Sequence, residues 1–175
     1  MGLVKIMSVY DIFNKMYKHA VTDEKLMRLL FYVAEHRDDD VTIKTDARPN
    51  IVGDFDVINQ VVKICRPNEG DLLPDNAQCV LYIYLGEFEN SVMVNTGTVN
   101  PTSFYQYVNL DAYVHEDYQN TGFALAKIVD RLLALFNQVH VGGVGAVKFM
   151  TAAKLDDVDK YEGMQIKLRN MYTQN

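Results

Sequence analysis

The chain has 175 residues, a mass of 20.0 kDa and a net charge of −6 at pH 7, and 49% of its residues are hydrophobic. This length and composition predict one domain, spanning 1–175, whose core is large enough to fold without disulfides or a metal. The acidic balance and the scattered Lys and Arg argue against tight nucleic acid binding, because neutralised phosphates supply most of that affinity.

The sequence predicts neither a signal peptide nor a membrane span. Its N-terminus has no charged region followed by an apolar stretch, and no apolar run approaches the ~20 residues of a spanning helix. The two cysteines, Cys65 and Cys79, each lie in an apolar run. We therefore expect two buried, reduced thiols on strands of an intracellular protein.

Two helices and a long loop are predicted at the start of the chain. Apolar residues recur at helical spacing over 8–20 and again over 22–36, where Thr22 can cap the helix and acidic residues follow it. The segment 37–56 contains three consecutive Asp, a Pro and a Gly, and it has no periodicity. We expect an extended loop, the arm (37–56), of the kind that often orders on a partner.

The middle of the chain has the character of strands. Residues 58–66 are rich in β-branched side chains, 79–88 are apolar on both faces, and 91–95 form a candidate short strand. The segment 79–88 is therefore expected to be a central strand. Residues 103–115 alternate over a long span, with Tyr on the face opposite the core. That face is either half-wet and suited to a protein contact, or covered by a helix.

A third helix is predicted over 120–137, followed by strands over 146–152 and 162–173 with a polar hairpin loop between them. Helices and strands are segregated along the chain, and one helix crosses over among the strands. This order predicts an α+β fold: a mostly antiparallel sheet with two N-terminal helices and one crossover helix packed on one face.

None of the polar motifs makes a convincing catalytic site. His115, Glu116 and Asp117 are consecutive, and neighbouring side chains on a strand point to opposite faces. Asp38–Asp40 lacks the alternating spacing of a calcium loop, and the glycines of 142–145 follow a helix rather than a strand, the reverse of a phosphate loop. We therefore predict a protein that is not an enzyme and needs no cofactor or metal.

The order of segments resembles that of tail terminator (tail-completion) proteins of tailed bacteriophages. The similarity includes VVKICRP, CVLYIYLGEF and, most strongly, Val108–Phe136, in which the strand YVNLDAYVHEDYQ leads into the helix ALAKIVDRLLALFNQ. In that family a strand of the form "xxDIYVHED" runs into a helix like "ISDRINELL", then a Gly-containing turn and closing strands. One departure is the turn GEFEN, which replaces a basic turn found in some relatives.

The resemblance implies a structural protein of the virion, assembled in the host cytoplasm. Such proteins form a ring, commonly a hexamer, on the head-proximal end of the tail tube, where the ring stops tube growth and presents the surface that joins the head. The implied partners are further copies of the chain, the tail tube protein and neck or head-completion proteins, with DNA only passing through the lumen. A ring requires two different, complementary surfaces on each subunit. The arm and the 103–115 strand are the candidates, with these residues: Asp38, Asp39, Asp40, Asp46, Arg48, Tyr105, Tyr107, Tyr113, His115 and Glu116.

Three other functions fit the same sequence. A neck or head-completion ring subunit differs from a terminator by its partners more than by its fold. A small metal-dependent enzyme would use His115, Glu116 and Asp117. A monomeric adaptor or inhibitor would bind one host protein.

Overall fold

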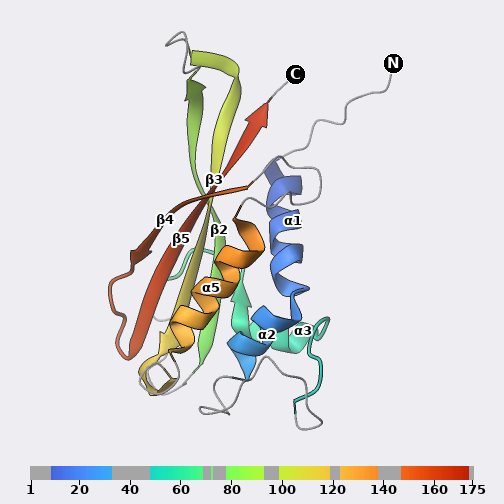
Figure 1. The fold of residues 1–175 in the computed structure, drawn as a ribbon, viewed down its shortest axis with the longest axis vertical. Coiled ribbons are helices and arrows are strands. Elements are labelled where there is room, and N and C mark those ends of the chain that lie inside the picture. The colour runs from blue at the N-terminus through green and yellow to red at the C-terminus, as the bar shows by residue number, and fades with distance from the viewer. Residues whose placement is uncertain are drawn as a thin grey trace.

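The fold is α+β, as the sequence predicts, and is built on one five-stranded sheet (Figure 1). The computed structural model describes residues 9–32, 48–68, 72, 78–92, 99–118, 123–137 and 147–173, without the side chains of 90–92, 99–104 and 171–173. The helices are α1 (Val9–Val21), α2 (Glu24–Phe31), α3 (Phe55–Val61) and α5 (Ala124–Phe136). The strands are β1 (Val62–Lys63), β2 (Cys79–Val92), β3 (Val99–His115), β4 (Lys148–Lys154) and β5 (Tyr161–Thr173).

The strands lie in the order β1-β2-β3-β5-β4. The short β1 runs parallel to β2, and every other neighbouring pair is antiparallel. β3 is the middle strand. β2 lies between β1 and β3, and Cys79–Ile83 are buried on both faces, so the expectation of a central strand is confirmed for this half of 79–88. β1 pairs only with Leu81 and Tyr82, so most of β2 has just one strand neighbour among the described residues.

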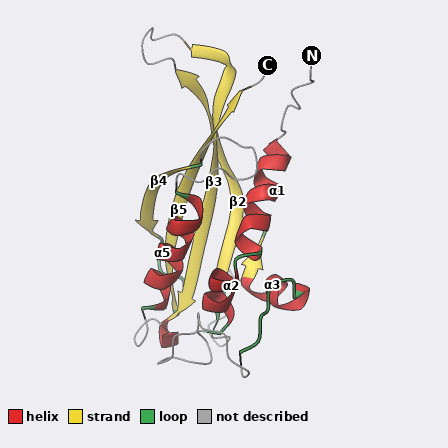
Figure 2. Cartoon of the chain, turned by 45° about the vertical axis from the view of Figure 1, so that its right-hand side comes forward, coloured by secondary structure: helices red, strands yellow, loops and turns green. Residues whose placement is uncertain are grey.

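All four helices contribute to a single core on one face of the sheet (Figure 2). Val108, Leu110, Ala112 and Val114 of β3 point into this core, and they meet α5 through Ile128 and other buried residues. This alternation matches the face predicted from the sequence. Burying a side chain of this size contributes about 1.5–3 kcal/mol, which explains why helices and sheet stay together. No helix among the described residues is both long and apolar enough to cross a membrane.

The predicted strand over 58–66 is wrong in most of its length: 58–61 belong to helix α3, and only Val62–Lys63 form a strand, β1. Asp54 begins the helix: its side chain accepts hydrogen bonds from the backbone amides of Asp56 (3.0 Å) and Val57 (3.2 Å). Val57, Ile58 and Val61 then face the core at helical spacing. β-branched residues favour strands only weakly, so an N-cap and one buried face outweigh that preference.

Several element ends also differ from the prediction. α2 begins after Asp23, which accepts a hydrogen bond from Leu26 N, whereas the Thr22 hydroxyl donates to Lys18 O at the end of α1. The predicted short strand over 91–95 is in part the end of β2. Cys79 is buried, as expected, but Cys65 is exposed because it follows β1 rather than lying inside a strand.

Candidate functional site: the helix-free face and the open edges of the sheet

Opposite these helices, the sheet presents a second face, which none of the described helices covers and which is here called the helix-free face. At one end it carries a small apolar cluster of Leu72, Val80, Tyr82, Tyr113 and Tyr161, against which Leu155 and Val158 pack. The cover therefore comes from the β4–β5 connection and from Leu72. Neither of the two alternatives expected for the Tyr side chains, a wet face or a helix, describes this end.

Tyr113 is fixed inside that cluster. Its ring meets Tyr82 edge-on at 5.9 Å between centroids, and it lies so close to Gly163 that a Cβ there would come within 2.6 Å of it. Tyr113 is 5% exposed. It was expected to contribute to a contact surface, but in the subunit it contributes to the interior.

A polar trio follows along the same face, with one buried member, Asp111, and two half-buried ones. Asp111 accepts hydrogen bonds from the hydroxyl of Tyr84 (2.7 Å) and the side-chain amide of Gln165 (3.0 Å). Burial raises the pKa of Asp111, although both hydrogen bonds and the charge of Arg66 oppose the rise. Burial, together with the hydrogen bond to Asp111, raises the pKa of Tyr84 to about 12. The trio therefore locks β2, β3 and β5 together with polar contacts.

An open hollow of about 450 Å³ lies beside the trio. Its lining includes Arg66, Tyr84, Gly86, Asn109 and Lys167. Gly86 permits this shape, because a Cβ at that position would come within 3.1 Å of Tyr107 Cβ and 3.2 Å of Asn109 Nδ2. The hollow is polar, and two cations, Arg66 and Lys167, line it, but nothing in its lining selects a particular ligand.

Three cations of the helix-free face each stack on a Tyr ring. Arg66 lies 5.9 Å from the centre of the Tyr84 ring, Lys167 lies 4.4 Å from that of Tyr107, and Arg169 lies 4.3 Å from that of Tyr105. Two acids of β2 contact the same side chains: Glu87 pairs with Lys167 (3.4 Å), and Glu89 accepts a hydrogen bond from the Tyr107 hydroxyl. Tyr107 is only 7% exposed, whereas Tyr105 is half-buried. Most of the charges of this face are therefore already matched within the subunit.

The described part of the arm packs against α2. Asp38, Asp39, Asp40 and Asp46 lie outside the described residues. Arg48 is 8% exposed, and its carbonyl accepts a hydrogen bond (2.6 Å) from the fully buried guanidinium of Arg28. The Tyr32 hydroxyl donates to the next carbonyl, that of Pro49 (3.0 Å). Arg48, a candidate contact residue, is therefore buried within the subunit, where its carbonyl anchors the arm to α2.

His115 is buried at the end of β3, at 2% exposure, and its ring meets Tyr161 edge-on at 5.1 Å. Its Nδ1 lies 3.4 Å from a carboxylate oxygen of Asp117 and accepts a weak bond from the Asp117 amide (3.3 Å). Glu116 is exposed. Within the described ranges, no three His, Cys, Asp or Glu side chains gather as a metal site would require.

The two edges of the sheet are features that sequence reasoning missed. From Leu85 onward, β2 has no strand on its outer side among the described residues, and Leu85 and Phe88 are 43% and 56% exposed. β4 forms the other edge and is mostly exposed, from Lys148 to Lys154. The end of the β2–β3 hairpin also extends beyond the helices (Figures 1 and 2). The exposed Leu85 and Phe88 flank an irregularity at Gly86 and Glu87. Gly86 is the signal in the sequence from which this irregularity could have been predicted.

Comparison with known proteins gives one family. The family model YomW matches residues 23–170, which is most of the chain. The chain belongs to the YomW family. The match states no function for the family, and no curated protein matches the chain. The matched range begins at Asp23, just before α2, and ends within β5, so it includes the sheet and both of its open edges.

Proposed function

We propose that this YomW-family chain is a tail terminator: a structural subunit that forms a ring, of about six copies, on the head-proximal end of a phage tail tube and joins the tail to the head or neck. DNA passes through the lumen of the ring. The proposal rests on the resemblance of Val108–Phe136 to tail terminators and on the shape of the subunit.

The observation that carries the proposal is a single sheet with two edges that no other described strand covers, and a hairpin that extends past the helices. A strand edge exposes backbone donors and acceptors that readily pair with another chain. Two different open edges on one subunit supply the complementary pair of surfaces that a closed ring requires. The acidic net charge of −6 is also consistent with DNA sliding past without being held.

The neck-ring alternative keeps the same fold and is separated from the terminator by its partner. The metal-enzyme alternative has no observation in its favour, because His115 is buried against Tyr161 while Glu116 lies exposed.

The deciding experiment measures the solution mass of the purified chain and images it by negative stain, alone and mixed with tail tubes of its own phage. Rings of about six subunits, free or on one end of the tubes, are the expected result. A strict monomer that never binds tube ends would overturn the proposal, and rings that bind the head connector but not tubes would support the neck alternative.

A deletion within the arm tests its part in assembly. The deletion should cover 38–46 and keep Arg48, whose carbonyl is bonded to Arg28. The variant is expected to keep the circular dichroism spectrum of the wild type and to lose rings. Loss of the folded signal would mean that the arm belongs to the core of the subunit.

A further inference from the structure

The two open edges of the sheet run in opposite directions. β2 is antiparallel to β3, β3 to β5, and β5 to β4, so β2 and β4 are antiparallel to one another across the sheet. Figure 1 shows the same relation, with the β2 arrow pointing up and the β4 arrow pointing down. If copies are related by rotation about an axis to which the strands are tilted, as in a closed sheet, β4 of one copy meets β2 of the next in antiparallel orientation. The helix-free faces of all copies then lie on the same side.

We propose that the outer edge of β4, residues 148–152, pairs antiparallel with the outer edge of β2, residues 85–89, of a second copy of this chain. The inference rests on the proposed function, because it names the contact that joins subunits into the ring.

The side chains on the two edges match face by face in one register. Lys148 is level with Arg169 on the helix-free face, and Glu89 is level with Tyr105 on the same face. Setting Lys148 opposite Glu89 of the neighbour therefore brings together opposite charges. Both side chains are exposed in the single subunit.

The same register places apolar side chains together on the helix side. Phe149 comes opposite Phe88, and Ala152 comes opposite Leu85. Phe149 and Ala152 face the helical side, because they are paired with the core residues Leu168 and Ile166. Leu85 and Phe88 face the same side. Leu85 and Phe88 are among the large apolar side chains that the subunit leaves exposed, and this pairing would cover them.

The irregularities of the two strands also coincide. β2 has its register shift between Leu85 and Phe88, and β4 has its shift between Phe149 and Thr151. In the proposed register these shifts lie side by side, so neither interrupts the matched pairs. Within one subunit, Phe149 is level with Leu85, because Phe149 pairs with Leu168, Leu168 with Val108, and Val108 with Leu85. In the proposed contact, Phe149 lies opposite Phe88 of the neighbouring copy instead. Successive copies are thus staggered, as the closure of a sheet around an axis requires.

Two symmetric alternatives are disfavoured. Pairing two β2 edges would bring Glu87 and Glu89 of each copy together, and pairing two β4 edges would leave Leu85 and Phe88 exposed. Like charges on facing strands are destabilising. The β4–β2 contact is therefore heterologous, the type from which rings are built.

Engineered disulfides test the register directly. In a Cys65→Ser background, Leu85→Cys with Ala152→Cys places the two thiols opposite each other in neighbouring copies. Under mild oxidation, a non-reducing gel should show a ladder of covalent oligomers. The matched control is Leu85→Cys with Lys154→Cys, which moves one thiol two residues along the same face. That diagonal separation is about 7 Å or more, beyond the usual reach of a disulfide, so this variant should give little ladder.

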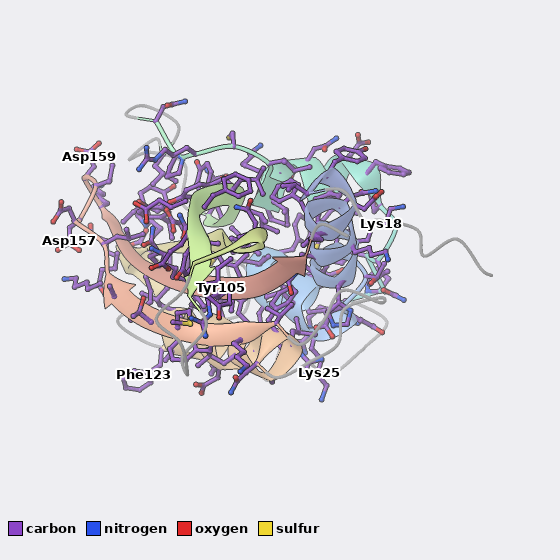
Figure 3. The ribbon with its side chains drawn as sticks, turned by 90° about the horizontal axis from the view of Figure 1, so that it is seen from above. Lys18, Lys25, Tyr105, Phe123, Asp157 and Asp159 are labelled. Atoms are coloured by element: carbon purple, nitrogen blue, oxygen red, sulfur yellow. The ribbon has the colours of Figure 1, made fainter. Side chains whose placement is uncertain are left out.

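Charge reversal provides a second test that needs no oxidation. Lys148→Glu and Glu89→Lys should each raise the dissociation constant of self-association by roughly three- to tenfold, and the double variant should recover most of the loss. The matched control is Lys25→Glu, the same charge change on an exposed residue of α2 in the helical layer (Figure 3). Equal behaviour of Lys148→Glu and Lys25→Glu would overturn the charge pair.

The outcomes separate this inference from the proposed function. Wild-type rings together with no more ladder for the designed pair than for its control would overturn the edge pairing and leave the ring intact. A ladder from a chain that never binds tube ends or necks would support the pairing and overturn the terminator. A monomeric chain without a ladder would overturn both.

Discussion

Asp23 holds two helices together, and its removal is the most direct test of how the helical layer is assembled. One oxygen of its carboxylate accepts hydrogen bonds from Leu26 N (2.7 Å) and from Arg131 Nε (2.9 Å), and the other accepts from Arg131 Nη2. The first bond caps α2, and the others tie α2 to α5 across a long stretch of sequence. The side chain of Asp23 is 14% exposed and that of Arg131 is 29% exposed, so water screens the pair only in part.

The magnitude follows from these two roles. Losing an N-cap costs about 1 kcal/mol. Losing hydrogen bonds between charged, partly buried groups costs about 1–3 kcal/mol. Asp23→Ala should therefore lower the free energy of unfolding by about 2–4 kcal/mol. Asp23→Asn retains a good cap and loses the charge, and it should cost about 1–2 kcal/mol.

The effect should depend on pH in a defined direction. Burial alone would raise the pKa of Asp23, but the hydrogen bonds from Arg131 and Leu26 outweigh it and lower the pKa below its usual 3.8. A lowered pKa in the folded state stabilises the protein above the unfolded value, and this stabilisation is lost as pH falls through the lowered value. The cost of Asp23→Asn should therefore be full at pH 7 and should shrink toward pH 2.

Urea unfolding followed by circular dichroism measures these differences. The matched control is Asp130→Asn, the same chemical change at an exposed position next to Arg131 on α5. It should change stability by less than about 0.5 kcal/mol. A loss as small for Asp23→Ala as for Asp130→Asn, or an Asp23→Asn penalty that does not change with pH, would refute this account of the helix pair.

Three further substitutions test other contacts. Arg28→Met removes a fully buried guanidinium that donates to backbone carbonyls at the end of the arm, and it should cost about 2–4 kcal/mol in urea unfolding; a cost below 1 kcal/mol would contradict that role. Asp111→Ala strips two donors of their acceptor and should cost about 1–3 kcal/mol, whereas Asp111→Asn keeps an acceptor and should cost less, so equal losses in thermal melts would count against the trio. Gly86→Ala places its new Cβ 3.1 Å from Tyr107 Cβ and 3.2 Å from Asn109 Nδ2 and should cost about 1–2 kcal/mol; Asn109→Ala in the same chain should recover the part due to Asn109, and no recovery would assign the strain to Tyr107.

The parts of the fold predicted correctly are those set by local periodicity. The alternation of 103–115 fixed both faces of β3, and the helical stripe of α5 fixed its buried side. α3 was missed because its β-branched residues indicate a strand, and only the Asp54 cap distinguishes the two. Strand order was beyond reach, since it depends on which distant strands pair. The sequence therefore could not place β2 beside an open edge.

The burial of two candidate contact residues could not be predicted for a related reason. The faces assigned to Tyr107 and Tyr113 are correct, but their burial depends on residues far away in the chain. Tyr113 is covered through Gly163 and the β4–β5 connection, and Tyr107 is covered by Lys167 of β5. An alternating pattern shows which way a side chain points. It does not show what lies above it.

The location of the contacts follows from what the subunit has already used. Arg169 stacks on Tyr105 and Lys167 stacks on Tyr107, so a partner on the helix-free face would have to displace contacts that the subunit makes by itself. The outer backbone of β2 beyond Leu85, by contrast, has no strand partner within the described chain. Such an edge gains hydrogen bonds from pairing without giving up side-chain contacts. Tyr105→Ala should therefore leave rings intact where Lys148→Glu weakens them, as sedimentation of the two variants at equal concentration would measure. If Tyr105→Ala weakened the rings and Lys148→Glu left them intact, the contact would lie on the helix-free face rather than at the edges of the sheet.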